Sequence, residues 1–291
     1  MKPMIKWTAL ALAVCLPLSA QAHRAWMLPS ATVLSGEDPW ITVDAAVSND
    51  LFYFEHVPLR LQGIGNLDQA PASGPPGMRA RPASQLHVIA PDGSPIQAEN
   101  GAIGHYRSTF DVHLTQKGTY KLAVANNGLF ARWKENGQMR RWMGTPEAFA
   151  KEVPAKGEDL KVSQNSSRME VFVTSGNPSK EVLTPTGKGL EMAPITHPND
   201  LFAGEAAEFA FLLDGEPAAG VKISVIPGGN RYRDHLGEIH ATTDEQGKVS
   251  ITWPEAGMYW LEAEMISDKG VSEPATERRA TYSATLEIQA P

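Results

Sequence analysis

Strict alternation of apolar and polar residues, interrupted by turn residues, is the feature that most limits how this chain can fold. From Val221 to Val225, apolar residues alternate with Lys222 and Ser224. Such alternation is typical of strands with one buried face. The same pattern recurs over 106–114, 120–124 and 251–253. Helical periodicity is scarce, apart from a short helix predicted over 145–152, and we therefore predict an all-β protein.

A weak internal repeat predicts two related β-sandwiches in tandem. Asp-Gly-Ser-Pro at 92–95 precedes Gly-Thr-Tyr-Lys-Leu at 118–122, and Asp-Gly-Glu-Pro at 214–217 precedes Gly-Met-Tyr-Trp-Leu at 257–261. A strand that follows a glycine turn and buries its tyrosine is typical of immunoglobulin-like sandwiches. Between the halves, 175–197 is rich in Pro, Gly, Ser, Thr and Lys, as linkers are. We therefore place the domains at 23–190 and 191–291.

The first 22 residues are typical of a cleaved signal peptide. Lys2 and Lys6 precede an apolar run over 7–18, and Ala-Gln-Ala at 20–22 is a small-x-small cleavage site. Val14 is bulkier than the residue that lipidation signals place before a cysteine such as Cys15. No later run reaches the length of a membrane span. We therefore expect a periplasmic protein, cleaved after Ala22, that is not embedded in the membrane.

Charge and cysteine content exclude several classes of function. The net charge of −7 disfavours nucleic acid as a partner. The single cysteine lies in the predicted signal peptide, so the mature chain has neither a disulfide nor a thiol nucleophile. Signatures of the ordinary hydrolases and a phosphate-binding glycine loop are also missing from the sequence. Any metal site must therefore use nitrogen and oxygen donors, with methionine sulfur as a further option.

Cleavage after Ala22 makes His23 the first residue of the mature protein, and this is the most informative chemical feature. Its α-amine and its Nδ1 atom together close a six-membered chelate on one metal ion. One more histidine from a neighbouring strand would complete a three-nitrogen site, which suits Cu(II), Ni(II) or Zn(II). The alternative is that His23 merely begins a strand.

Two other histidines of the first half are the preferred partners of His23. His56 ends an aromatic segment just before Pro58, near an edge or loop. His113 shares a strand face with Asp111, which would hold it in place as a ligand. A solvated strand face without metal explains His113 equally well. His105 ranks lower because it follows a glycine turn.

Three further segments are interpreted structurally. Asn-Gly at 136–137 predicts a type I′ hairpin between arms that carry Trp133 and Trp142; these rings either pack in a core or bind an anionic or sugar-like ligand. His-Pro-Asn-Asp at 197–200 predicts a turn. The segment 67–82, with four prolines and two glycines, predicts an exposed loop.

The sequence resembles the domain-of-unknown-function 4198 family along nearly all of the mature chain. His-Arg-Ala-Trp-Met-Leu-Pro-Ser at 23–30, directly after Ala-Gln-Ala, is similar to the start of its members. Further similar segments lie at 118–120, 199–204, 214–217, 243–248 and 254–261. The resemblance implies an exported protein related to periplasmic components of nickel and cobalt uptake. Of the family's ligands it implies only His23, and it implies a structural, immunoglobulin-like or transthyretin-like second half.

Three functions follow as hypotheses. The leading one is a periplasmic protein, not an enzyme, that binds Ni, Co, Cu or Zn through His23, His56 and His113 and passes the ion to a membrane importer or outer-membrane receptor. The second is a metal-free binding or scaffold module. The third is a copper enzyme that cleaves polysaccharides oxidatively, by analogy of an amino-terminal histidine on a β-sandwich.

Overall fold

The computed structural model describes residues 23–69 and 83–291, and in these ranges the chain is mostly β, as the alternation predicts. The predicted signal peptide, Cys15 and residues 70–82 of the predicted loop lie outside the described residues. Within them the strands form three sheets. No helix of the described residues is long and apolar enough to cross a membrane.

The N-terminal sheet contains the first strand of the described residues. Its spatial order is β1 (Arg24–Pro29), β3 (Trp40–Ser48), β8 (Ser108–His113) and β7 (Glu99–Ile103), with β4 (Val57–Pro58) on β3. Every pairing in this sheet is antiparallel. β3 alternates between exposed and buried residues from Trp40 to Val43, which gives the sheet one apolar face.

A long shared sheet runs through both halves of the chain. Its order is β16 (Ile239–Thr242), β15 (Lys222–Pro227), β18 (Gly257–Ser267), β19 (Glu277–Ile288), β11 (Glu158–Ser175), β9 (Gly118–Glu135), β5 (Leu86–Ile89) and β6 (Pro95–Ile96), with β10 (Gln138–Gly144) on β9 and β2 (Val33–Leu34) on β11. β11 and β19 join the halves, because they pair in parallel from Ser163–Glu277 to Val171–Thr285.

The C-terminal sheet covers the second half of the shared sheet. It contains β12 (Leu190–Pro194), β13 (Ala206–Leu213) and β14 (Glu216–Pro217), with β17 (Lys248–Thr252) on β13. The predicted domain junction at residue 190 falls on the first residue of β12 and stays a prediction. Short helical segments are α1 (Pro146–Glu152), η1 (Leu67–Gln69), η2 (Glu181–Leu183) and η3 (Asn230–Tyr232).

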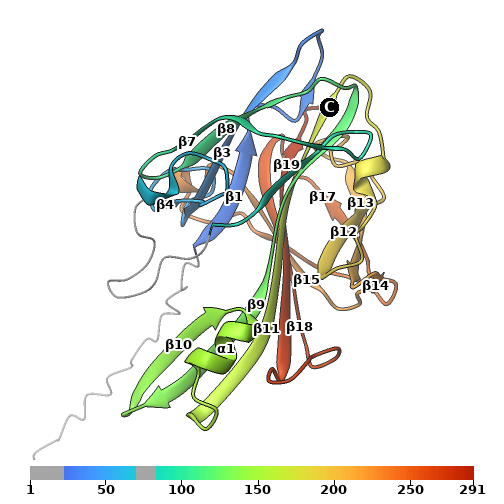
Figure 1. Ribbon diagram of the computed structural model, residues 1–291. Helices are drawn as coiled ribbons and strands as arrows, with labels where there is room; N and C mark the ends of the chain where they lie inside the picture. The colour runs from blue at the N-terminus through green and yellow to red at the C-terminus, as the bar shows by residue number, and fades with distance from the viewer. Residues whose placement is uncertain (1–22, 70–82) are drawn as a thin grey trace, which may run out of the picture.

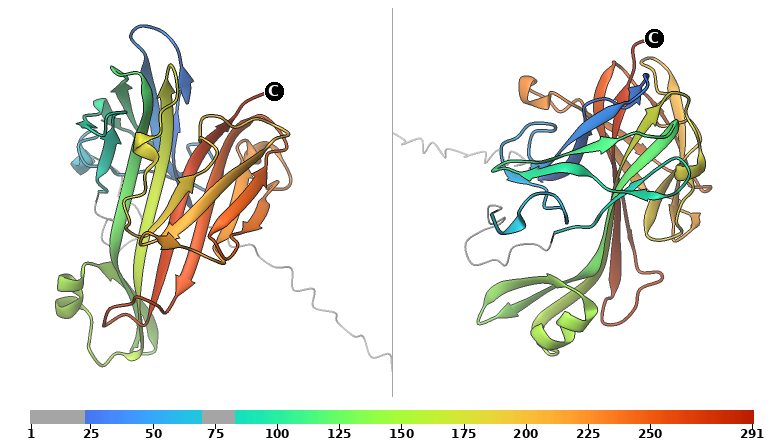
Figure 2. Two further views of the ribbon diagram at one scale, coloured as in Figure 1. Left: turned by 90° about the vertical axis from the view of Figure 1, so that its right-hand side faces the viewer. Right: turned by 45° about the horizontal axis from the view of Figure 1, so that its top comes forward.

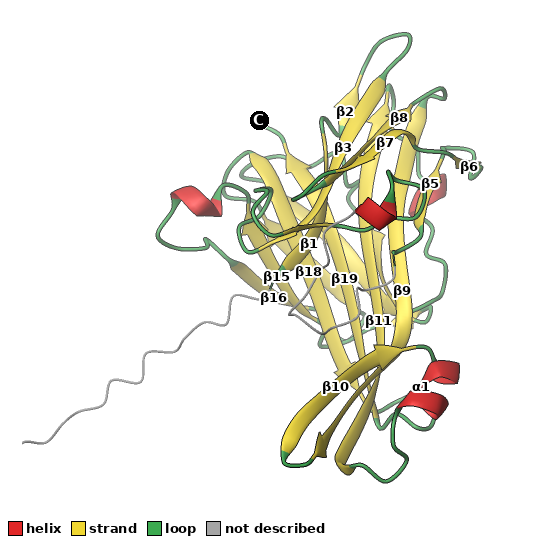
Figure 3. Cartoon of the chain, turned by 60° about the vertical axis from the view of Figure 1, so that its left-hand side comes forward, coloured by secondary structure: helices red, strands yellow, loops and turns green. Residues whose placement is uncertain are grey.

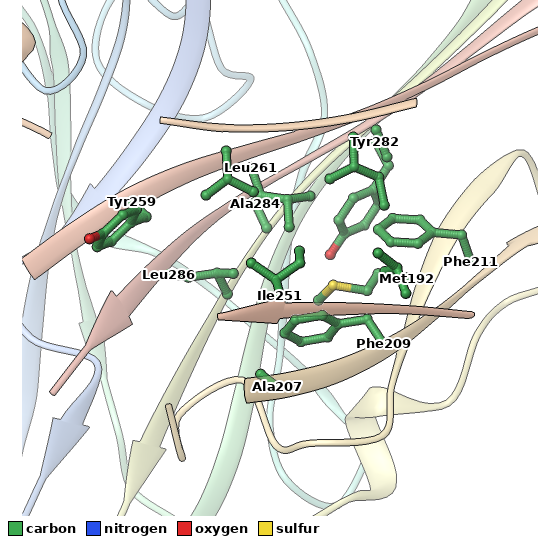
Figure 4. Close-up of a cluster of buried hydrophobic side chains, with 14 of the residues drawn as sticks. Met192, Ala207, Phe209, Phe211, Ile251, Tyr259, Leu261, Tyr282, Ala284 and Leu286 are labelled. Carbon is green, nitrogen blue, oxygen red and sulfur yellow. The ribbon is translucent and has the colours of Figure 1, made fainter. Parts of the chain in front are cut away.

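Two sandwiches therefore share one central sheet, which confirms the predicted β-sandwich class. In Figures 1 and 2 the N-terminal sheet, blue to teal, and the C-terminal sheet, yellow to orange, lie beside the long central strands. Each sandwich has its own buried core. In the second core, Phe209 and Phe211 of β13 face Tyr282 and Leu286 of β19, as Figure 4 shows. Burial of such aromatic and aliphatic side chains drives the packing of the sheets.

The tyrosines of the predicted repeat, Tyr120 and Tyr259, have equivalent surroundings in the two halves. Tyr120 and Tyr259 are fully buried, and each hydroxyl donates to a backbone carbonyl four residues earlier, at Gln116 and Glu255 respectively. This contact resembles the tyrosine corner of immunoglobulin-like sandwiches. The Asp-Gly-x-Pro turns are not equivalent, since the first joins β5 to β6 in the shared sheet and the second joins β13 to β14 in the C-terminal sheet.

The lower ends of β9, β11 and β18 extend beyond both sandwiches and form a lobe with β10 and α1 (Figure 1). The helix begins where the sequence predicts, because the Thr145 hydroxyl accepts a hydrogen bond from the Ala148 N–H and Pro146 takes the first helical position. The hairpin turn at Asn136 and Gly137 has positive φ at both residues, as a type I′ turn requires.

Candidate metal site

His23 and His56 meet at one end of the N-terminal sheet. Arg24 pairs with Ser48 on one edge of β3, and Val57 pairs with Val47 on the other edge. His23 precedes Arg24 and His56 precedes Val57, so the two histidines lie on opposite sides of the same end of β3. Their imidazole rings reach across the end of β3 and stack on each other, with their centroids 3.9 Å apart and their planes 7° from parallel. Both residues are exposed.

The position of His23 is fixed by the two residues that follow it. Arg24 Nη1 donates to the Asn49 carbonyl at 3.4 Å, and the Ala25 carbonyl accepts from Trp260 Nε1 at 3.1 Å. Trp26 is fully buried in a small core with Ile226 and Trp260. The start of β1 is therefore attached both to β3 and to the shared sheet, because a buried tryptophan and its polar contacts resist displacement.

The loop from Asn49 to Glu55 sets the position of His56. Glu55 Oε1 accepts from the Asn49 backbone N–H at 2.6 Å, so the two ends of the loop are joined. At the loop's start, the Ser48 hydroxyl accepts from Trp26 Nε1 at 2.8 Å and donates to the Asp50 carbonyl at 2.6 Å. Such contacts keep a short segment in one conformation, although it lies outside a strand.

The second half of the chain also holds this loop. Asn230, which is 7% exposed, accepts from the Leu51 N–H at 2.9 Å and donates to Asp50 Oδ1 at 3.2 Å. The guanidinium of Arg231 lies over the Tyr53 ring, 4.0 Å from its centroid. The second half thus supports the segment that carries His56, whereas the family resemblance implies only a structural module there.

Aromatic residues secure the middle of the same loop. Phe52 has a φ of 60°, which is uncommon for a bulky residue, and its ring meets Trp26 edge-on at 5.5 Å. A side chain at Gly228 would meet the Phe52 ring at 2.8 Å, so the approach of Phe52 requires glycine there. The Arg107 guanidinium lies 4.4 Å from the centre of the Phe54 ring.

An acidic surface lies on the shared sheet beside Arg24. Ser224 pairs with His240 and with Glu262, which places the side chains of all three on one face. Burial raises the pKa of Glu262, and Glu264 adds to this effect, while the positive charge of Arg24 opposes it. Carboxylates beside the start of β1 make the potential there more favourable for a cation.

His113 lies far from the other two predicted ligands. It pairs with Trp40 at the opposite end of β3 from Ser48, which is eight residues or roughly 26 Å along the strand. Its ring stacks on Trp40 at 4.1 Å, and its Nε2 atom lies 2.5 Å from Asp38 Oδ1. This hydrogen bond lowers the pKa of Asp38. His113 therefore does not belong to the site of His23.

The carboxylate predicted to hold His113 has other partners. Asp111 accepts from Thr42 Oγ1 at 2.7 Å and from Asn100 Nδ2 at 2.8 Å. These two hydrogen bonds lower its pKa. The contact predicted from the shared strand face was wrong, because a loop residue, Asp38, reaches the His113 ring from outside the strand.

His105 is at the same end of the sheet as His56, although its sequence context ranks it lower. It lies in the turn before β8, and Arg107 of that turn packs over Phe54. The His105 ring meets Tyr106 edge-on at 4.6 Å. The pairing of Ala45 with Ser108 in β8 brings this turn to the end of β3, and the sequence alone carries no signal for that pairing.

The predicted turn at 197–200 is part of a buried hydrogen-bond network. His197 Nε2 lies 3.0 Å from Thr119 Oγ1 and 3.1 Å from the Ser179 carbonyl, and its Nδ1 accepts from the Asn199 N–H at 3.1 Å. Asn199 Nδ2 donates to the Phe172 carbonyl at 2.9 Å. Both ring nitrogens are thus engaged, so His197 is no candidate ligand.

The two tryptophans of the predicted hairpin pack inside the lobe. Trp133 is 8% exposed and belongs to a core with Leu129 and Val162. Trp142 lies against Phe149 of α1 at 5.6 Å and donates from Nε1 to Glu152 at 2.9 Å. Of the two interpretations of these rings, the structure shows the core packing.

The chemistry of the pair fits a transition metal only in part. His23 and His56 supply imidazole nitrogens, which suit Cu, Ni, Co and Zn, and an α-amine at His23 would make three nitrogen donors. Among residues 23–69 and 83–291, no group of three or more His, Cys, Asp or Glu side chains is close enough to hold an ion. Imidazole nitrogens bind a metal at the edge of the ring, whereas stacked rings turn their faces to each other. One of the two exposed rings must therefore turn before both bind the same ion.

Comparison with known proteins identifies the family. None of the curated proteins matches the sequence significantly. The model of a family described as "Domain of unknown function (DUF4198)" matches residues 20–267, which is most of the chain. The chain therefore belongs to the DUF4198 family.

Proposed function

We propose that the mature protein binds a divalent transition metal ion in the periplasm through His23 and His56, and that it does so without turnover. The observation that carries this proposal is the contact between these two rings, 3.9 Å apart. A histidine chelate at an amino terminus needs another nitrogen donor within reach, since metal–nitrogen bonds are about 2 Å long. His56 is such a donor.

The third nitrogen in the proposal is the α-amine of His23. It becomes available if signal peptidase cleaves after Ala22, and it shares a residue with Nδ1, so little conformational freedom is lost on binding. His113 is not included, given its place at the other end of β3. The resemblance to nickel and cobalt uptake components favours Ni(II) or Co(II) as cargo, and Cu(II) and Zn(II) also prefer nitrogen donors.

Transport is the second part of the proposal. An exported protein that holds an ion by two exposed histidines is suited to release it to another binding site, because exposed ligands exchange partners easily. We propose a membrane importer or an outer-membrane receptor as that partner. The acidic surface around Glu262 supports a role in cation capture by raising the local cation concentration.

The decisive experiment is Ni(II) and Cu(II) titration of protein purified with His23 as its first residue. The comparison protein carries one extra glycine before His23, which moves the α-amine out of chelating position. We expect affinity to fall by about a hundredfold or more, because a ligand itself is lost and loss of outer contacts alone costs about ten- to a hundredfold. Equal affinity for both proteins would eliminate the chelate.

Two substitutions complete this test. His56→Ala should weaken binding by a similar factor, while His113→Ala is the matched control and should leave it unchanged. Absence of binding by all of these proteins would favour the metal-free scaffold alternative. Reductant-dependent peroxide production by the copper-loaded protein would instead favour the oxidative enzyme.

A further inference from the structure

The lobe has one covered face and one open face. Buried residues of β9 and β11, such as Ala131 and Val162, form a core under α1 together with Phe149 and Val153. Alternate residues of the same strands point the other way. Figure 3 shows α1 beside the strands of the lobe and β10 as their outer strand. No described strand pairs with the outer edge of β10.

Three cations form a row across the open face. Arg141 of β10 pairs with Arg132 of β9, and Arg132 pairs with Lys161 of β11. Residues directly opposite each other in neighbouring strands point to the same face, with about 5 Å between strands. All three side chains are exposed. We call Arg141, Arg132 and Lys161 the cationic row.

The members of the cationic row form no ion pair with a described carboxylate, whereas two neighbouring cations do. Lys134 Nζ lies 2.7 Å from Asp159, and Arg140 Nε lies 2.8 Å from Glu135. None of the three row residues has a carboxylate within ion-pair distance among the described residues. Like charges directly opposite in a sheet destabilise it. Asp159 lies close enough to Lys161 for the charge of that lysine to help lower the pKa of Asp159. The repulsion is therefore strongest between Arg141 and Arg132, and an anion bound across the row would relieve it.

Exposed apolar side chains flank the cationic row. Met139 and Met143 lie on either side of Arg141 in β10 and are 50% and 56% exposed. Met143 pairs with Phe130 of β9, which is half-buried. Methionine is flexible and polarisable, and it is common at surfaces that adapt to a partner. Charge complementarity and apolar contact are thus available on one face.

We propose that the open face of the lobe binds a partner protein through a helix with an acidic stripe. On a helix, side chains at i, i+4 and i+7 follow one another at about 5–6 Å, close to the spacing of the row. Acidic residues of an extended strand repeat on one face at nearly 7 Å and fit less well. Apolar residues beside the acidic stripe contact Met139, Met143 and Phe130.

Two other occupants are disfavoured by the charges of the lobe. A second copy using the same face would bring Arg141 and Arg132 against their equivalents, which repel. An anionic membrane would meet Glu158 and Asp159 in the next row, since Glu158 pairs with Lys134. On a helix, the acidic stripe lies over the cationic row itself, and only the apolar residues beside the stripe reach the next row, where Met139 lies.

The test uses the full mature chain and a stapled helical peptide with Glu at i, i+4 and i+7 and Leu beside them. Its binding is measured by fluorescence anisotropy at low salt and mapped by NMR. We expect binding that shifts the amides of β10 and the lower part of β9. A peptide with Gln in place of Glu should not bind. The variant R132Q/R141Q/K161Q should bind at least about tenfold more weakly, since exposed ion pairs contribute up to about fivefold each.

The control variant K188Q/K222Q/K248Q removes the same charge from exposed lysines elsewhere and should bind like the unmodified protein. If both variants bound the peptide equally more weakly, the proposal would be overturned, because the loss of binding would then follow from the net charge of the protein and not from the cationic row. Absence of peptide binding at millimolar concentration would overturn it as well. So would binding to phosphatidylglycerol vesicles without binding to the peptide, which would assign the face to a membrane.

Discussion

Asn230 and Leu51 lie 179 residues apart in the sequence, and the Asn230 side chain accepts a hydrogen bond from the Leu51 backbone N–H at 2.9 Å. The same side chain donates to Asp50, so one residue of η3 holds two positions of the loop that carries His56. The C-terminal half therefore takes part in shaping the candidate metal site.

Replacing Asn230 by alanine should loosen this loop. The buried Leu51 N–H loses its acceptor, at a cost of about 1–3 kcal/mol in the free energy of unfolding. We expect faster hydrogen exchange at the Leu51 amide and weaker metal binding, with no change in the far-ultraviolet circular dichroism spectrum. The exposed Asn127→Ala is the control. Unchanged exchange at Leu51 in the Asn230 variant would argue against a positioning role.

The sequence predicts local structure here better than it predicts long-range pairing. The Thr145 cap and the Asn-Gly hairpin depend on a few neighbouring residues, and both are found where expected. The sequence predicts the strand over 120–124 and the hairpin arm that carries Trp133 as separate elements, yet both belong to β9. Asn126, Asn127 and Gly128 disfavour a strand locally, but pairing with β11 at 165–167 holds them in the ladder.

The same distinction applies to the site. Chemistry singles out His23 and His56 from the sequence, but their contact depends on which strands flank β3. That information is non-local, and it equally decides that His113 lies at the other end of the strand. The contacts of Asn230 and Arg231 with the loop come from the second half of the chain, so no pattern near His56 indicates them.

His197 should make stability depend on pH. Burial lowers its pKa in the folded state, while the Ser179 carbonyl partly opposes this effect. The unfolded chain therefore takes up a proton at a higher pH than the folded chain, so this histidine's contribution is present above about pH 6.5 and declines as the pH falls below it. Urea unfolding of the protein and of His197→Gln between pH 8 and pH 5 tests this, with exposed His87→Gln as the control. A constant difference between protein and His197 variant across that range would contradict it.

Removing the Tyr282 hydroxyl should destabilise the joint between the two halves. Tyr282 of β19 is fully buried and donates at 3.0 Å to Glu170 of β11, whose other oxygen lies 3.2 Å from Arg168. In Tyr282→Phe the buried carboxylate loses a donor, and we expect a loss of about 1–3 kcal/mol in the free energy of unfolding. Tyr106→Phe, in an exposed turn, is the matched control. Equal stability of both variants in urea would show that the Glu170 contact contributes nothing.

Neutralising the centre of the cationic row should stabilise the protein when no partner is present. Arg132 lies directly between Arg141 and Lys161, so Arg132→Gln removes two unfavourable pairs at once. We expect a gain of roughly 0.2–1 kcal/mol per pair at low ionic strength, and a smaller gain at high salt, where exposed charges are screened. Lys248→Gln, which lies on the exposed side of β17 opposite Ala210, should change stability little. Thermal unfolding at two salt concentrations measures both effects. A loss of stability in Arg132→Gln at low salt would mean that the row is stabilised within the chain itself, and the argument for an external acidic partner would then lose its physical basis.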